Sequence, residues 1–187
     1  PTISRRQRQM CIRDSFCVAA TISKGNLKIK GFDPKLINTE LNLLKKVGAK
    51  IKINEKLISI AGPEKIKPIK NIVTKEWPGV ATDMQSQLMV LMCRANGKST
   101  ITENIFENRF LHVGELQRLG ADIQVKKNKA IIRGNTKFVG AEVMSSDLRA
   151  SVALVLAAII SNGKSTINRI YHLDRGCLLY TSDAADD

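Results

Sequence analysis

The groups in this chain that could do chemistry are two aspartates and three arginines, all at the predicted ends of helices or in loops. Asp83 and Asp147 each follow a hydroxyl residue, in TDMQSQ and SSDLRA, and each precedes an apolar helical run. Arg149 stands two residues after Asp147, while Arg109 and Arg175 lie in loops. A carboxylate can accept the proton of a hydroxyl group, and arginine donors suit carboxylates and phosphates. We expect Asp83 to face a substrate in a cleft that these arginines share.

Helix capping is the simpler interpretation of both aspartates. A short polar residue at a helix N-terminus accepts backbone N–H groups and stabilises the helix by about 1 kcal/mol. The helix dipole favours the ionised form of a capping carboxyl, which makes it a poor base unless it is partly desolvated. We therefore expect Asp83 and Asp147 to cap their helices, and a role for Asp83 in catalysis needs a further argument.

The segment NIFENRFLH, at residues 104–112, predicts a loop before a helix. Its Glu107 and Arg109 are close enough along the chain to form an ion pair, and His112 is expected to cap or pack. No second histidine stands at metal-ligand spacing, so we predict neither a metal nor another cofactor. Cys17 and Cys93 fall within apolar helical runs without a CxxC pair, which predicts buried, reduced thiols.

Two Gly-Lys-Ser-Thr strings, at residues 97–100 and 163–166, resemble part of a phosphate-binding loop. That motif needs a further glycine five positions earlier and must precede a helix. The two positions hold Met92 and Ala158, and both strings follow a helical run. They are predicted to end helices and to lead into strands.

The chain repeats one structural unit. The residues around Gly48 match those around Gly120, 72 positions later, and NGKSTI at 96–101 matches 162–167, 66 positions later. The periodicity predicts helices at 16–23, 35–47, 84–95, 112–119 and 148–159, strands at 27–30, 98–102 and 165–167, and hairpins at 50–60 and 121–133. Since the helices carry wide apolar faces, we expect an α/β (α+β) fold, an incomplete inside-out barrel of βαβαββ units with helices inside a ring of sheets.

Composition sets further bounds. The 187 residues are 43% apolar and carry a net charge of +13, which excludes a disordered or fibrous chain and suits anionic ligands. No apolar run approaches the roughly 20 residues that span a membrane, and no signal peptide is recognisable, so the cytoplasm is the expected compartment.

The two ends of the chain are predicted to be foreign. RRQRQMCIRDS and CLLYTSDAADD can be encoded by inverted repeats of one DNA sequence, as in a translated sequencing adapter. The expected organisation is an artefact at 1–15, a partial barrel domain of about two and a half units at 16–176, and an artefact at 177–187.

Four strings then become recognisable together: TDMQSQ, ENRFLHVGELQRLGA, SSDLRASVALVLA and INRIYHLDRG. In this order and at these separations they resemble the bacterial UDP-N-acetylglucosamine enolpyruvyl transferases. The resemblance implies two inside-out barrels with the substrates between them, and transfer of enolpyruvyl from phosphoenolpyruvate to the sugar 3-hydroxyl in peptidoglycan synthesis. It also implies Asp83 as the base, Arg175 on phosphoenolpyruvate, Ile105 on the sugar nucleotide, and Arg109, Asp147 and Arg149 around the reaction centre.

The departures from that family are large. Its first segment and its whole second domain, with the mobile loop and cysteine found there, are absent, and neither Cys17 nor Cys93 corresponds to that cysteine. We therefore expect a fragment that is inactive alone and lacks the partner domain of its own chain. Two alternatives stay open: the related 3-phosphoshikimate 1-carboxyvinyltransferases, and a basic nucleic-acid-binding repeat module. Against the latter, the lysines are scattered and aromatic residues are few.

Overall fold

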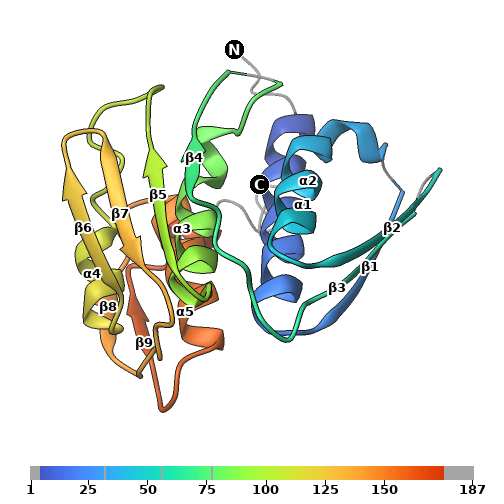
Figure 1. Cartoon of the computed structure of the whole chain (residues 1–187). Helices are drawn as coiled ribbons and strands as arrows, with labels where there is room; N and C mark the ends of the chain where they lie inside the picture. Colours follow the sequence, from blue (N-terminus) through green and yellow to red (C-terminus); the bar gives the residue numbers. More distant parts are fainter. Residues whose placement is uncertain (1–4, 32, 56, 77, 175–187) are drawn as a thin grey trace, which may run out of the picture.

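The computed structural model describes residues 5–31, 33–55, 57–76 and 78–174, and its strands form three separate sheets around a group of helices (Figure 1). The first sheet is antiparallel, in the order β1 (Asn26–Lys30), β3 (Leu57–Ala61), β2 (Lys50–Asn54). The second has the order β4 (Asn71–Val73), β5 (Lys98–Thr102), β7 (Lys129–Arg133), β6 (Asp122–Lys126). The third pairs β8 (Glu142–Met144) with β9 (Thr166–Asn168).

The helices connect these strands. They are α1 (Arg5–Ile22), the 3₁₀ turn η1 (Pro34–Ile37), α2 (Asn38–Lys46), the 3₁₀ turn η2 (Thr82–Met84), α3 (Gln85–Arg94), α4 (Val113–Arg118), α5 (Leu148–Ile159) and α6 (Tyr171–Asp174). β4 runs parallel to β5 and β8 runs parallel to β9, with α3 and α5 as the respective crossovers. The second unit therefore has the complete order β4-α3-β5-α4-β6-β7, which is the predicted βαβαββ.

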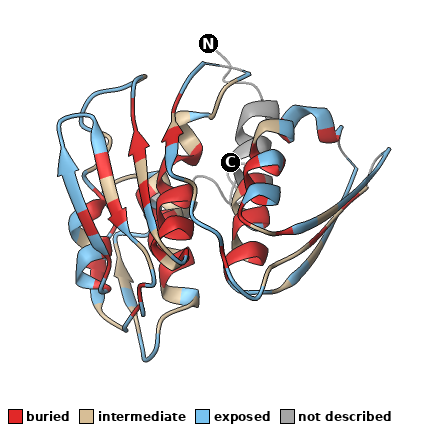
Figure 2. Ribbon diagram, viewed as in Figure 1, coloured by how far each residue is buried: buried red, intermediate tan, exposed pale blue. Residues whose placement is uncertain are grey.

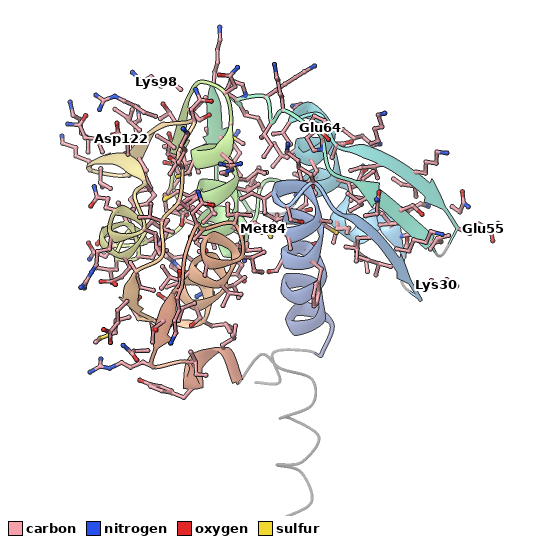
Figure 3. The ribbon with its side chains drawn as sticks, turned by 90° about the horizontal axis from the view of Figure 1, so that it is seen from below. Lys30, Glu55, Glu64, Met84, Lys98 and Asp122 are labelled. Carbon is pink, nitrogen blue, oxygen red and sulfur yellow. The ribbon has the colours of Figure 1, made fainter. Side chains whose placement is uncertain are left out.

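Helix α3 forms the centre of the molecule. Every residue from Gln85 to Cys93 is buried, and α3 packs against both α1 and α5. In Figure 2 these helices are largely coloured as buried, while the strands alternate between buried, intermediate and exposed residues. A helix that is buried on all sides needs cover all round. Met84, just before α3, is 1% exposed and lies in the middle of the molecule in Figure 3, whereas Lys30, Glu55 and Asp122 lie at its edges. The helices thus lie inside the sheets, as predicted.

The predicted repeat is visible in the backbone. Gly48 and Gly120 both have positive φ, 107° and 97°, at the ends of α2 and α4. In both turns the amide after the glycine donates to the carbonyl five residues earlier, at 3.0 Å, as in a Schellman cap. Gly97 and Gly163 also have positive φ and precede β5 and β9. The Gly-Lys-Ser-Thr strings are therefore helix ends that lead into strands.

Several element boundaries differ from the prediction. Helix α1 begins at Arg5 rather than at residue 16, and its buried Asp14 belongs to the segment expected to be foreign. The helix predicted at 35–47 is divided into η1 and α2, because Pro34 opens a separate 3₁₀ turn that Asp33 caps. The short strands β4 and β8 were not located from the sequence, since three residues give no readable alternation. No helix in the described ranges is long and apolar enough to cross a membrane.

Candidate active site

The predicted site residues all follow the C-terminal ends of parallel strands. Asp83 comes after β4, the 103–112 loop after β5, and Asp147 with Arg149 after β8. Ligands of open α/β sheets bind outside the carboxyl ends of the strands, where loops and helix N-termini converge. Arg175 comes after β9 and lies outside the described residues.

Asp83 and Arg149 form an ion pair across two units. Arg149 Nε donates to Asp83 Oδ1 at 2.5 Å, and both side chains are 37% exposed. The expectation that Asp83 caps its helix is wrong: Ala81 occupies the N-cap of η2 and makes no side-chain cap bond. Asp83 lies inside the 3₁₀ turn, past the position from which a side chain accepts the free amides. The carboxylate is therefore available for contacts outside its own helix.

Asp147 does cap its helix, as predicted. Its Oδ1 accepts the backbone N–H groups of Arg149 at 2.8 Å and Ala150 at 3.1 Å. Burial raises the pKa of Asp147, but these two amides and the Ser146 hydroxyl outweigh it, so the pKa lies below its usual value. Asp147 thereby fixes the backbone of Arg149, and the Ser86 hydroxyl on α3 holds the Arg149 carbonyl at 3.1 Å. The guanidinium that reaches Asp83 comes from a well-anchored turn.

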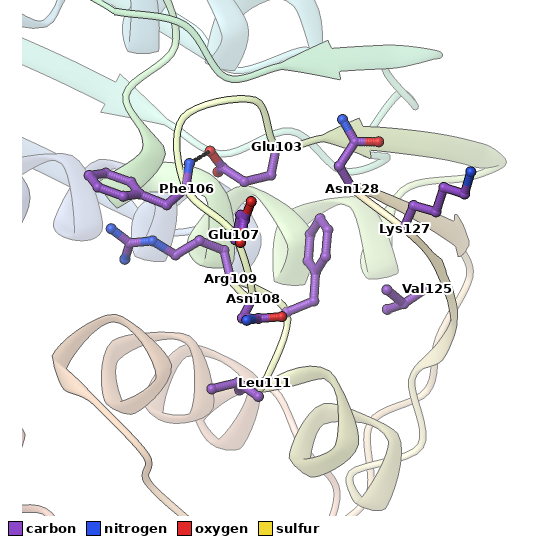
Figure 4. A pocket seen from close by; sticks show the side chains of 10 residues that line it. Glu103, Phe106, Glu107, Asn108, Arg109, Leu111, Val125, Lys127 and Asn128 are labelled. Carbon is purple, nitrogen blue, oxygen red and sulfur yellow. Dashed lines mark hydrogen bonds between the residues drawn. The ribbon is translucent and has the colours of Figure 1, made fainter.

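The loop after β5 forms one side of a pocket of about 480 Å³ (Figure 4). Arg109 lies over the Phe106 ring, 4.4 Å from its centroid. The expected ion pair between Arg109 and Glu107 is not formed within the described residues, where Arg109 stacks instead. Phe106 and Leu111 are 53% and 71% exposed. The loop thus presents a cation and apolar side chains on an open face.

His112 is a buried packing residue at the start of α4. It is 4% exposed and makes no side-chain cap bond. Burial lowers its pKa to about 4, against opposing effects of Asp147 and the Arg109 backbone. Its Nε2 has no hydrogen-bond partner among the described residues. His112 is therefore neutral near pH 7, in agreement with the packing role considered for it.

Glu103, two residues before Ile105, is a buried residue that could not be identified from the sequence. The Ile105 amide donates to Glu103 Oε1 at 2.8 Å, and Glu103 itself is only 2% exposed. The available signal was an acidic residue directly after β5, at the carboxyl end of a predicted strand. Periodicity alone assigns such a residue to the solvated end of the strand, so its burial could not be anticipated.

Cys17 and Cys93 are buried and free, as predicted. Burial raises the pKa of each thiol to about 12. Such thiols do not provide a thiolate nucleophile near neutral pH. No group of three or more histidine, cysteine, aspartate or glutamate residues that could hold a metal ion occurs in the searched part of the chain.

Comparisons with known proteins give consistent matches. The family described as EPSP synthase (3-phosphoshikimate 1-carboxyvinyltransferase) matches residues 14–182. Over 162 residues the chain is 58% identical to UDP-N-acetylglucosamine 1-carboxyvinyltransferase of Pelagibacter ubique (strain HTCC1062), covering 87% of this chain and 39% of the relative. The protein of that name from Desulfosudis oleivorans is 49% identical with the same coverage. The chain thus spans about two fifths of the length of these relatives.

Two solved structures share the fold. The enolpyruvyl transferase NikO from Streptomyces tendae superposes with a TM-score of 0.83 at 24% identity, over 95% of this chain and 42% of that one. EPSP synthase from Acinetobacter baumannii gives a TM-score of 0.73 at 19% identity, over 95% and 44% of the two chains. At these identities the likeness establishes the fold alone.

Proposed function

The chain belongs to the EPSP synthase family of carboxyvinyl transferases, and from this premise we propose that the protein containing it makes a peptidoglycan precursor. In this proposal it transfers the enolpyruvyl group of phosphoenolpyruvate to the 3-hydroxyl of UDP-N-acetylglucosamine and releases phosphate. The observation that carries the proposal is the high identity with relatives of that name over most of the chain. The geometry at Asp83 and Arg149 supports it.

Asp83 is proposed as the proton acceptor. An alcohol is a weak nucleophile, and it attacks faster when a carboxylate removes its proton in the transition state. In the addition step the sugar oxygen bonds to C2 of phosphoenolpyruvate while C3 gains a proton. In the elimination step C3 loses a proton and the C2–O bond to phosphate breaks. Asp83 suits the first step because it is not used as a cap and remains partly exposed at a strand end.

Arg149 is proposed to exchange partners when phosphoenolpyruvate binds. Phosphoenolpyruvate carries a carboxylate and a phosphate, for which forked guanidinium donors are suited. The 37% exposure of Arg149 lets an anion compete with Asp83 for it. The exchange would release the carboxylate for proton transfer and neutralise substrate charge in one movement. We propose that Arg109 and Arg175 assist on the same anion, and that Ile105 lines the sugar nucleotide site.

The rest of the cleft is proposed to come from elsewhere in the full-length protein. Residues 16–176 form one partial barrel in this proposal, and a second domain of the same chain supplies the opposite wall. We accordingly expect the 187-residue chain to be inactive on its own. Because both substrates are phosphorylated metabolites of the cell interior, the cytoplasm is the proposed compartment, with no nucleic acid or membrane as partner.

The direct test is phosphate release by the full-length protein. Phosphoenolpyruvate with UDP-N-acetylglucosamine should give stoichiometric phosphate, whereas phosphoenolpyruvate with 3-phosphoshikimate should not. The second acceptor is included because the matching family carries its name. Release with 3-phosphoshikimate alone would reassign the substrate within the family, and release with neither would refute the proposal.

A further inference from the structure

Glu103 is a buried carboxylate that ties three segments together. Its Oε1 accepts the Thr74 hydroxyl at 2.9 Å and the amides of Ile105 at 2.8 Å and Phe106 at 3.2 Å. Its Oε2 accepts the Thr82 hydroxyl at 2.8 Å. Figure 4 shows Glu103 bonded back to the Phe106 amide at the start of the loop. The four bonds join the end of β4, the turn before α3 and the loop after β5.

These bonds use the full acceptor capacity of the group. A carboxylate has about four acceptor positions, and Glu103 accepts four bonds, three at Oε1 and one at Oε2, from two hydroxyls and two amides. None of the ion pairs within the described residues includes Glu103. Burying a carboxylate without a cation costs free energy unless hydrogen bonds compensate. The Glu103 bonds therefore define one geometry for the segments that donate them.

Comparison of the repeats indicates that the βαβαββ unit does not require a buried carboxylate at the position of Glu103. The NGKSTI strings are 66 residues apart, and this spacing makes Arg169 the counterpart of Glu103 in the next unit. The 72-residue spacing makes Gly31 its counterpart in the preceding unit. Both counterparts are exposed. Ser146, the counterpart of Thr82, donates to its own neighbour Asp147 at 3.2 Å instead of crossing to another segment. Among the residues that the structure describes, the carboxylate bridge at this position occurs in the second unit alone, which is the unit that contains Asp83.

We propose that Glu103 is a positioning residue that sets Asp83 relative to the loop carrying Ile105 and Arg109. Thr82, which immediately precedes Asp83, donates to Oε2 of Glu103. Oε1 accepts the backbone amides of Ile105 and Phe106 in the loop. The bridge thus fixes the distance between the proton acceptor and the loop that lines the sugar nucleotide site. This inference rests on the proposed function, since it concerns the geometry of the same reaction.

The experiment compares variants of the full-length protein in steady-state phosphate release. Thr82→Val removes only the hydroxyl that links Asp83 to Glu103, so kcat should fall about 10- to 100-fold, the scale of a small misplacement of a reacting group. KM for UDP-N-acetylglucosamine should not change, because the loop stays tied to Oε1. Thr82→Ser restores a hydroxyl and should recover most of kcat.

Glu103→Gln is the second variant. Its amide oxygen can keep the bonds to the Ile105 and Phe106 amides while its NH₂ group faces Thr82. Hydrogen exchange at those two amides should therefore remain slow, and kcat should fall less than in Thr82→Val, because the Thr82 hydroxyl can accept from the new NH₂ group. Glu103→Ala should speed that exchange and raise KM as well. Thr21→Val is the matched control, since it removes another buried threonine hydroxyl, one that donates to the Cys17 carbonyl at 2.8 Å within its own helix α1. Its kcat should equal that of the wild type.

The outcomes separate the inference from the function. Wild-type protein without phosphate release refutes the proposed function. An active wild type whose Thr82→Val and Glu103→Gln variants keep full kcat overturns the positioning role of Glu103. The same conclusion follows if Thr82→Ser recovers nothing, or if Thr21→Val lowers kcat as much as Thr82→Val does. If Thr82→Val does not fold, Glu103→Ala with its exchange measurement decides alone.

Discussion

Replacement of Asp83 by asparagine tests whether this carboxylate is a base or only a partner of Arg149. Asparagine keeps the size of the side chain and an oxygen at the position that accepts Arg149 Nε. It loses the ability to take the proton of an attacking hydroxyl group. The structure therefore predicts an effect on rate with little effect on folding.

The two magnitudes can be estimated separately. General-base catalysis contributes about 10²- to 10⁴-fold, which corresponds to about 3–5 kcal/mol in the barrier. The ion pair is 37% exposed on both sides, and pairs of that kind contribute about 0.2–1 kcal/mol to stability. Asp83 also lacks a capping bond, so no helix is weakened. Asp83→Asn should thus lose at least about 100-fold in kcat while the melting temperature barely changes.

The assay is phosphate release by the full-length protein, combined with calorimetric titration of UDP-N-acetylglucosamine. Asp83→Asn should still bind the sugar nucleotide, because only the proton transfer is removed. Asp122→Asn is the matched control, since Asp122 also accepts an arginine, Arg133, at 3.2 Å but on an exposed sheet face. A variant with near-wild-type kcat would show that Asp83 is not the base, and a loss of binding as large as the loss of kcat would make Asp83 a binding residue only.

Three further predictions follow from burial and close contacts. Burial lowers the pKa of His112 from 6.5 to about 4, so between these pH values the unfolded state binds a proton and the folded state does not. The free energy of unfolding should therefore fall by on the order of 3 kcal/mol as the pH drops from 6.5 to about 4. His112→Gln should flatten the pH dependence of the urea midpoint. A Cβ on Gly134 would lie 2.0 Å from the Ala95 carbonyl oxygen, so Gly134→Ala should destabilise the protein by about 1–3 kcal/mol or more. Gly114→Ala, in open space on α4, should instead stabilise it by about 0.5–1 kcal/mol in the same thermal unfolding assay. Cys93 is fully buried and should resist a thiol reagent at pH 8 until denaturant is added.

Much of the fold could be predicted because it is encoded locally and repeatedly. Glycines 48 and 120 end equivalent helices, and the strand at residues 98–102 and the hairpin after α4 appear where the alternation placed them. The short strands β4 and β8 could not be located, since each has three residues and depends on a parallel partner far along the chain. Non-local pairing of this kind leaves no periodic signal.

The contacts of the candidate site residues were harder to predict than their places in the chain. The contacts of Asp83 and Arg109 were assigned wrongly. Local rules favour a cap for the former and an i, i+2 ion pair for the latter. Both side chains found partners that the tertiary fold supplied: Arg149 from another unit for Asp83, and the face of Phe106 for Arg109. Glu103 was missed for the same reason, because the two hydroxyls that donate to it, those of Thr74 and Thr82, come close to it only in the folded chain.

The repeat explains how one frame produces an asymmetric site. In the two units that carry them, Asp83 and Asp147 occupy equivalent positions, and so do Gln85 and Arg149. Asp147 accepts the amides of its own helix, which holds Arg149 in the first turn of α5. Because α3 and α5 pack against each other, that arginine reaches Asp83 at the start of the neighbouring helix. If both aspartates capped, Arg149 would lose its carboxylate partner. The departure of Asp83 from the capping role is therefore what brings a carboxylate and a guanidinium group from two equivalent helix starts together, as the proposed roles of Asp83 and Arg149 require.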